Sequence, residues 1–261
     1  MDTRTSQVQL PDGTEIEFEQ VNAGLSVPIV LVLGLLQDTS DYLTLLKTIN
    51  RHFIIIHPRG QGKSQRVSAS DFTLLQLATD IFDVILHLNL VEFYLMGSDL
   101  GGTACLQLAF LLKGRDDMNC RGLILVSSFP TPISRGLLKH TIYNFTPELW
   151  VRRCMGDKWC DIEKDQFKVL SKRVGTFNID VLKEQMYCID GCNITDQLSL
   201  LDVRTLLIHG RDDVLVNSNY SSMIADGLKD SEIHILPDTG HWPQIDSSET
   251  IGSIVNLFLN E

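Results

Sequence analysis

Residues 93–102 read FYLMGSDLGG, an apolar run that passes into a glycine-rich stretch. The apolar segment 103–112 that follows is typical of a buried helix. A strand that enters a helix through glycines indicates a sharp, strained turn that presents a nucleophile, with glycines two places before and two places after it. Gly97 and Gly101 bracket position 99, so the spacing assigns the nucleophile position to Asp99.

Other interpretations of this stretch fit its residues less well. Ser98 lies one place off, and as a nucleophile it would put Met96 and Leu100 where only small residues fit. A phosphate-binding loop would need a GxGxxG or GxxxxGK pattern, which the stretch lacks, and Asp99 would repel the phosphate. An ordinary strand–helix turn with Asp99 as the helix N-cap stays open.

Strand and helix patterns alternate on both sides of this turn. Continuous apolar runs, typical of strands buried on both faces of a parallel sheet, occupy residues 29–33, 53–56, 93–96, 123–126, 205–209 and 232–236. Helical patterns occupy residues 42–49, 72–90, 103–112, 220–228 and 249–259. Residues 7–10 and 15–19 flank a Pro-Asp-Gly turn signal and predict an opening hairpin. The alternation predicts an α/β fold with a mostly parallel central sheet and helices on both faces.

Residues 130–197 interrupt the alternation. The segment is more polar than its flanks and contains two of the three tryptophans and four of the six cysteines. We interpret it as a helical cap inserted into a core that residues 1–129 and 198–261 form. Ligands of parallel α/β sheets bind beyond the carboxyl ends of the strands, and the candidate residues all follow such ends.

Two further polar residues follow late strands of the predicted sheet. Residues 206–213 read LLIHGRDD, and an acid directly after a late strand is where the orienting carboxylate of a triad belongs. We select Asp213, with Asp212 as the fallback. His241, in the loop after the last strand, is the candidate base. The chain order nucleophile, acid, histidine is the one expected for this kind of fold.

Composition limits the class of protein. The chain has 261 residues, of which 44% are hydrophobic and 21% charged, which suits one α/β domain with a large core. A net charge of −11 disfavours nucleic acids and anionic membranes as partners, because both are polyanions. Neither a secretory signal nor a run of about 18 apolar residues is visible, so we expect a cytoplasmic protein with a small-molecule substrate. The oligomeric state is open, with a homodimer as one option.

The cysteines do not form a recognisable metal motif. They stand at positions 105, 120, 154, 160, 188 and 192. No CxxC pair is present and no histidine lies beside them, so free thiols are the expected state. We expect neither a metal nor a cofactor.

The chain resembles the α/β-hydrolase superfamily over essentially its whole length. Residues 97–102 resemble the G-x-D-x-G-G turn of epoxide hydrolases and haloalkane dehalogenases, and residues 240–243 (GHWP) resemble the terminal G-H-W/F-P element of that group. Residues 59–64 (RGQGKS) are similar to its R-G-x-G-x-S loop. The resemblance implies a cap over the site, an aspartate nucleophile and a His–Asp pair that activates water.

The residue types imply a mechanism. A carboxylate needs no base to become a nucleophile, and it displaces a leaving group at an sp³ carbon, such as that of an epoxide or alkyl halide. His241, oriented by Asp213, would then activate a water that hydrolyses the ester on Asp99. The backbone N–H groups of Leu35 and Leu100 would form the oxyanion hole, each donor lowering the barrier by roughly 3 kcal/mol.

Several positions depart from the pattern of this group. The usual His-Gly-x-Pro loop is Leu-Gly-Leu-Leu at residues 33–36. Dehalogenases hold the halide with side-chain donors at the positions of Leu35 and Leu100, where leucine donates nothing, so epoxide hydrolysis is favoured. Opening an epoxide requires an acid, and Tyr143 and Tyr187 of the cap are candidates. The further substrate contacts that we predict are Gln37, Trp150 and Trp242.

Two alternatives stay open. The chain also resembles the cofactor-free dioxygenases of this fold that cleave 3-hydroxy-4-quinolones. The residues that carry this resemblance are Gly34, Gln37, Asp38 and Tyr42, together with Asp71-Phe72. Those enzymes carry serine at the turn, and a carboxylate there would oppose formation of the substrate anion. A non-catalytic receptor of the same fold is the second alternative, but the presence of all three triad residues disfavours it.

Overall fold

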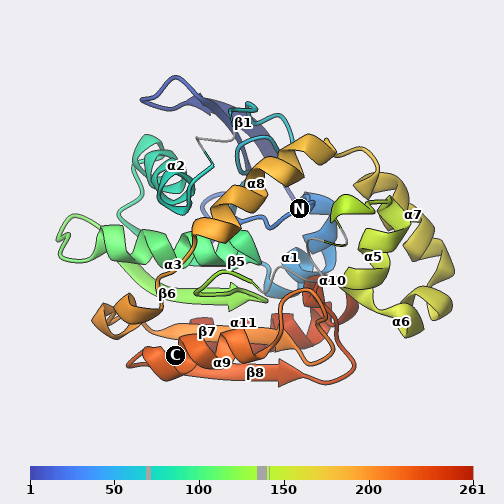
Figure 1. Cartoon of the computed structure of the whole chain (residues 1–261). Coiled ribbons are helices and arrows are strands. Elements are labelled where there is room, and N and C mark those ends of the chain that lie inside the picture. Colours follow the sequence, from blue (N-terminus) through green and yellow to red (C-terminus); the bar gives the residue numbers. More distant parts are fainter. Residues whose placement is uncertain (69–71, 134–139, 141, 261) are drawn as a thin grey trace.

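A central sheet of eight strands organises the chain, in the order β1-β2-β4-β3-β5-β6-β7-β8 (Figure 1). The computed structural model describes residues 1–68, 72–133, 140 and 142–260, apart from the side chains of residues 186 and 187. The strands are β1 (Thr3–Gln9), β2 (Glu15–Val21), β3 (Ile29–Val32), β4 (Phe53–Ile56), β5 (Glu92–Ser98), β6 (Asn119–Val126), β7 (Thr205–Gly210) and β8 (Ser231–Leu236). β1 and β2 form the predicted antiparallel hairpin, and β2 is also antiparallel to β4. The pairs from β4 through β3, β5, β6 and β7 to β8 are all parallel, as the apolar runs predicted.

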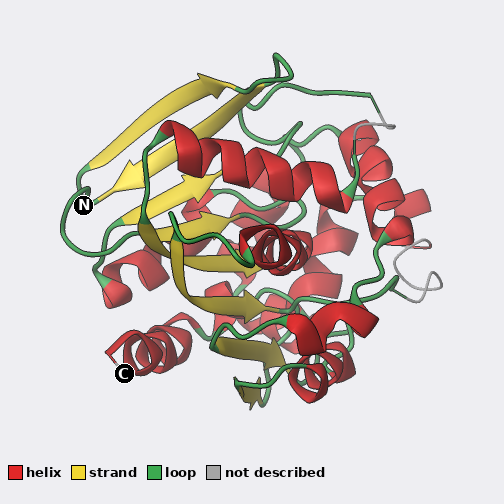
Figure 2. Cartoon of the chain, turned by 90° about the vertical axis from the view of Figure 1, so that its left-hand side faces the viewer, coloured by secondary structure: helices red, strands yellow, loops and turns green. Residues whose placement is uncertain are grey.

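Helices cover both faces of the sheet, and in Figure 2 the red helices surround the yellow strands. α1 (Leu43–Ile49) packs against α11 (Ser248–Asn260), and α2 (Leu74–His87) packs against α3 (Leu100–Leu112). Alternate residues of the strands divide between the two faces: Ile29 and Leu31 belong to the core cluster with α1 and α11, and Val30 and Val32 to the cluster with α2 and α3. Both faces of the inner strands are therefore buried, which explains their unbroken apolar runs.

A helical segment separates β6 from β7, where the cap was predicted. It contains α5 (Pro147–Met155), α6 (Asp157–Ile162), α7 (Lys164–Val174) and α8 (Ile179–Gly191), and the 3-10 helix η3 (Thr195–Leu200) follows. In Figure 1 the arrowheads of β6 and β8 point toward α5, α6 and α7. α8 runs back along the sheet and contacts α2. This segment, which we call the cap, thus lies at the carboxyl ends of the parallel strands.

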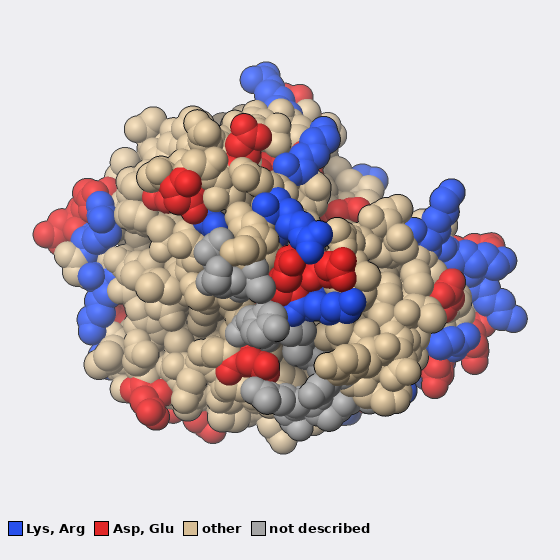
Figure 3. Space-filling view, turned by 45° about the horizontal axis from the view of Figure 1, so that its top comes forward, with Lys and Arg blue, Asp and Glu red and all other residues tan. Residues whose placement is uncertain are grey.

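The surface and the cysteines complete the description. On the face shown in Figure 3, Lys and Arg side chains lie intermixed with Asp and Glu. Within the described ranges, no helix combines the length and apolarity needed to cross a membrane. All six cysteines are free thiols, and all but the half-buried Cys120 are buried.

Candidate active site

Asp99 lies at a strained turn between β5 and α3. Its φ is 54° and its ψ is −127°, a conformation that non-glycine residues rarely adopt. A Cβ on Gly97 would lie 2.6 Å from the backbone of Gly101, and a Cβ on Gly101 would lie 2.5 Å from the carbonyl oxygen of Val32. The two glycines are therefore needed because backbone segments touch at both positions. Asp99 occupies the N-cap position of α3 without a capping side-chain hydrogen bond, so the simple N-cap interpretation does not describe it.

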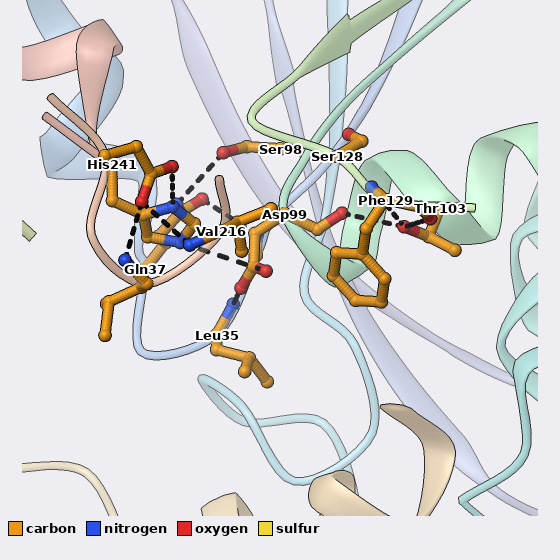
Figure 4. A network of polar contacts seen from close by, with 12 residues as sticks. Leu35, Gln37, Ser98, Asp99, Thr103, Ser128, Phe129, Val216 and His241 are labelled. Atoms are coloured by element: carbon orange, nitrogen blue, oxygen red, sulfur yellow. Dashed lines mark hydrogen bonds and ion pairs between the residues drawn. The ribbon is translucent and has the colours of Figure 1, made fainter. Parts of the chain in front are cut away.

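The structure brings the three predicted triad residues together, and Figure 4 labels two of them, Asp99 and His241. The Nδ1 atom of His241 lies 2.7 Å from Oδ2 of Asp213, and its Nε2 atom lies 3.8 Å from Oδ1 of Asp99. His241 and Asp213 are therefore hydrogen-bonded, whereas His241 and Asp99 form an ion pair that is longer than a hydrogen bond. The longer separation leaves room for a reacting atom between the imidazole and the carboxylate of Asp99. All three side chains are buried, and each follows the carboxyl end of a parallel strand, β5, β7 or β8.

Burial selects Asp213 over its neighbour Asp212. The Oδ1 atom of Asp213 accepts hydrogen bonds from the backbone N–H groups of Leu215 and Val216, at 2.9 and 2.8 Å. These bonds leave Oδ2 to face His241. Asp212 is exposed. The fallback is therefore wrong, because only Asp213 is placed to orient the imidazole.

His209 is a member of the site that the sequence analysis missed. It is the penultimate residue of β7, and its side chain is fully buried. Its Nε2 atom lies 3.1 Å from Oδ2 of Asp213 and 2.8 Å from the carbonyl oxygen of Val216. Both neighbours are acceptors, so Nε2 carries a hydrogen and donates. The Nδ1 atom of His209 lies 2.7 Å from Oγ of Ser221, which fixes the other edge of the ring. Asp213 therefore receives support from a second imidazole.

Charge and burial together determine the pKa values of His241 and Asp213. Burial on its own would lower the pKa of His241, but the carboxylates of Asp213 and Asp99 raise it to about 10. Burial would likewise raise the pKa of Asp213, but the charge of His241 and the hydrogen bonds from His209 and His241 lower it to about 2. Near neutral pH, His241 is thus an imidazolium held between two carboxylates.

The loop at residues 34–37 faces the second oxygen of Asp99. The backbone N–H of Leu35 donates to Oδ2 of Asp99 at 3.2 Å. Leu36, the next residue, has a left-handed φ of 55°. Leu100 is the first residue of α3, so its N–H lies at the helix N-terminus directly after the turn. This loop, which we call the oxyanion loop, places one of the two predicted donors on the carboxylate.

Gln37, predicted as a substrate contact, ties the oxyanion loop to the core. Its Oε1 atom accepts from the N–H of Gly34 at 2.8 Å and from the hydroxyl of Tyr42 at 2.6 Å. Its Nε2 atom donates to Oγ of Ser98 at 3.1 Å. The side chain is fully buried. The bonds to protein groups give Gln37 an anchoring role, and its contact with substrate stays a prediction.

The other predicted substrate contacts have different surroundings. Trp242, next to His241, and Trp150 of α5 are buried, whereas the side chain of Tyr143 is 76% exposed. The exposed ring of Tyr143 does not share the burial of Asp99, and its role as an acid stays a prediction. Tyr187 belongs to α8, but its side chain lies outside the described residues, as does Asp71.

A small cavity adjoins the turn from the side of α2. Its volume is about 10 Å³, close to the room that one water needs, and its lining includes Leu35, Leu100 and Gln185 of the cap. Neither Asp99 nor His241 lines it, so it is not where the triad would meet a substrate. Among the residues described, no group of three or more His, Cys, Asp or Glu side chains is placed to hold a metal ion.

Comparison with known proteins finds similarity over most of the chain. Residues 27–153 match the family model described as alpha/beta hydrolase fold. RutD of Pseudomonas syringae pv. syringae, to which carbamate hydrolase activity is attributed, is 26% identical over 236 residues that cover 85% of this chain and 88% of RutD. The 2-hydroxy-6-oxo-2,4-heptadienoate hydrolase of Pseudomonas putida is 24% identical over 96% of this chain and 94% of that protein. A hydrolase from Pseudomonas aeruginosa PA01 superposes with a TM-score of 0.87 at 17% identity and covers 99% of both chains.

A methyl group at Gly101 tests whether the turn depends on close backbone contact. We expect Gly101→Ala to lower the free energy of unfolding by about 1–3 kcal/mol, because its Cβ would collide with backbone atoms that cannot move aside. Gly191→Ala, which places a Cβ in open space at the end of α8, is the matched control and should leave stability unchanged or slightly raised. Equal stability of the two variants in chemical denaturation would contradict this account of the turn.

A second test concerns the proton on His241. Replacing Asp99 with Asn removes one of the two carboxylates that favour the imidazolium, so the pKa of His241 should fall by about one unit or more. NMR titration of histidine-labelled protein measures this shift. Asp238→Asn removes an exposed carboxylate of the same loop and should leave the titration unchanged. A pKa of His241 that is the same in Asp99→Asn and wild type would show that the two side chains do not interact.

Proposed function

We propose that this chain, which has the α/β-hydrolase fold predicted for it, hydrolyses a small organic substrate with Asp99 as the nucleophile and His241–Asp213 as the water-activating pair. The relatives named above, hydrolases of small organic molecules, support the general activity. The assignment of Asp99 as the nucleophile is supported by its position at the strained turn. One of its carboxylate oxygens faces the N–H of Leu35, and the other faces His241.

The residue type favours attack at an sp³ carbon. A carboxylate that adds to the carbonyl of an ester is a better leaving group than the alkoxide, so that adduct returns to reactants. Displacement at the carbon of an epoxide instead forms a stable alkyl ester on Asp99. The carbon–oxygen bond of the ring breaks, and the ring oxygen leaves with the electron pair and takes up a proton from an acid, for which Tyr143 and Tyr187 are the predicted donors. Epoxides lead over alkyl halides because the side chains of Leu35 and Leu100 have no donor for a halide.

Ester formation changes the state of His241. The alkylated Asp99 no longer carries a negative charge, so one of the two groups that raise the pKa of His241 is lost. The imidazole can then release its proton and act as a base through Nε2, while Nδ1 stays bonded to Asp213. The charge of the nucleophile therefore determines when the base becomes available.

Water completes the cycle. Neutral His241 removes a proton from a water, whose oxygen attacks the carboxyl carbon of the ester. The negative charge develops on Oδ2, the atom to which Leu35 N–H donates. Collapse of the tetrahedral intermediate breaks the bond between the carboxyl carbon and the substrate oxygen. The departing alkoxide takes up the proton of the added hydroxyl to give the diol, so Asp99 is again a carboxylate and His241 keeps the proton taken from water. Ser98, buried and bonded to Gln37, takes no part in these steps.

The two alternatives are less consistent with the charges of the site. A dioxygenase needs a neutral base and forms a substrate anion, but His241 is held as an imidazolium and Asp99 would face that anion. A receptor would have no use for a histidine supported by two acids. Both stay predictions, as do the absence of nucleic-acid and membrane partners, the cytoplasmic location and the homodimer.

Trapping of the ester tests the proposal. His241→Gln should still be alkylated, because the first step needs no base, but it should not hydrolyse the adduct. After incubation with a panel of epoxides that includes styrene oxide, mass spectrometry should find one added epoxide on the peptide that contains Asp99. Asp99→Ala should carry none. An adduct on another residue, or turnover that survives in Asp99→Ala, would overturn the nucleophile.

The pH dependence of the adduct is a separate prediction. Hydrolysis of the ester needs neutral His241, whereas alkylation does not, so acid slows only the second step. In wild type under turnover, the fraction of alkylated protein should rise as the pH is lowered from about 9 to about 6. Rapid acid quench and intact-mass analysis measure this fraction. A fraction that falls or stays constant over this range would contradict the assignment of His241 as the base of the second step.

A further inference from the structure

One arginine of the cap contacts both catalytic loops. Arg173 lies in α7, and its Nη1 atom donates to the carbonyl oxygen of Leu36 at 2.8 Å, although 137 positions separate them in the chain. Its guanidinium carbon lies 5.5 Å from the centre of the Trp242 ring, next to His241. The side chain is only 12% exposed. Arg173 thus meets the oxyanion loop on one side and the histidine loop on the other.

The contact with Leu36 concerns the donor of the oxyanion hole. Leu36 has a left-handed φ, which a leucine adopts only when its surroundings hold it there. The residue before it, Leu35, provides the N–H that faces Asp99. From the core side, Gln37 and Tyr42 fix the loop, and from the cap side Arg173 fixes the carbonyl of Leu36. A rotation at Leu36 would turn the neighbouring N–H away from the carboxylate.

A buried acid keeps Arg173 in place. Asp41, in the 3-10 helix η1 (Thr39–Tyr42), lies 3.0 Å from Nη2 of Arg173, and its side chain is fully buried. Burial raises the pKa of Asp41 to about 7 in spite of the arginine charge. Asp38 lies 4.0 Å from the same guanidinium. The guanidinium of Arg173 therefore lies against two acidic side chains at the base of the oxyanion loop.

A second contact joins the cap to the histidine loop. The backbone N–H of His241 donates to the carbonyl oxygen of Cys154, in the last turn of α5, at 2.6 Å. A Cβ on the preceding Gly240 would collide with the same carbonyl oxygen. The cap therefore rests directly on the loop of the base as well as on the oxyanion loop.

An ion pair that only connects the cap to the core would not need the contacts that Arg173 makes with the oxyanion loop and the histidine loop. Arg66 and Glu184 already join the loop after β4 to α8, at 2.7 Å, and both are partly exposed. That pair touches neither the oxyanion loop nor the histidine loop. It therefore provides a control for an arginine that only connects the two parts.

We propose that Arg173 is a positioning residue that couples docking of the cap to the geometry of the oxyanion hole. With the cap docked, the guanidinium holds the carbonyl of Leu36, and so the N–H of Leu35 points at Asp99. Without this contact, the loop loses its constraint on the cap side and the donor is misplaced. The kinetic consequence rests on the proposed function, whereas the structural consequence does not.

Hydrogen exchange tests the structural part without any substrate. In Arg173→Leu, exchange of the peptide that covers residues 34–37 should become faster than in wild type, while exchange of β5 stays unchanged. Arg173→Lys, which keeps one point charge but not the planar fork, should lie between the two. Arg66→Leu should leave this peptide unchanged. If exchange of the peptide is unaffected in both Arg173 variants, the proposal is overturned.

Kinetics test the consequence for the reaction. The oxyanion forms only in the second step, so Arg173→Leu should slow hydrolysis of the Asp99 ester by roughly 10- to 100-fold and change alkylation much less. Alkylated protein should then accumulate even though His241 is intact, and Arg66→Leu should show the wild-type ratio of the two rates. Equal slowing of both steps would overturn the positioning role. If no epoxide alkylates wild type, the proposed function fails. Hydrogen exchange alone then tests whether Arg173 couples the cap to the oxyanion loop.

Discussion

The site depends on one imidazole ring, that of His241, held between the side chains of two buried acids. Asp99 and Asp213 lie on either side of His241, at 3.8 and 2.7 Å from its ring nitrogens, and the charge of His241 lowers the pKa of the buried Asp213. Removing an ion from water costs several kcal/mol, which the attraction and the hydrogen bonds to Asp213 offset. The arrangement holds three chain segments together, and in the proposed reaction it keeps the base protonated until the charge of Asp99 is lost. Stability of the resting site and the order of the chemical steps thus have the same physical origin.

The fold supplies this arrangement through backbone contacts rather than through the side chains of the site alone. Parallel strands end at one edge of the sheet, so residues 99, 213 and 241 meet although they are distant in sequence. Close packing at Gly97 and Gly101 maintains the strained φ of Asp99, and the surrounding core stabilises that strain. The cap adds contacts from the other side, through Arg173 and the carbonyl of Cys154. Core and cap together therefore determine where the donors and the imidazole point.

The strands and the turn at Asp99 were predictable because each depends on a local sequence pattern. Buried strands appear as apolar runs, and the spacing of Gly97 and Gly101 around Asp99 predicts a turn that only small residues permit. His209 and Arg173 were missed because their roles arise from contacts between distant segments. His209 looks like one more residue of a buried strand, and Arg173 stands beside Lys172 on a polar helix. The choice between Asp213 and Asp212 likewise required the burial that only the folded chain shows, and the anchoring bonds of Gln37 depend on Ser98 and Tyr42 meeting in space.

Isotope transfer from water tests the central claim most directly. In a single turnover of excess wild-type protein with an epoxide in H₂¹⁸O, the product should contain no ¹⁸O, because its new oxygen comes from Asp99. The peptide that contains Asp99 should instead gain ¹⁸O, because the water oxygen enters the carboxylate when the ester is hydrolysed. A product that carries ¹⁸O after the first turnover, with none in that peptide, would show direct attack of water on the substrate and contradict the role of Asp99 as nucleophile.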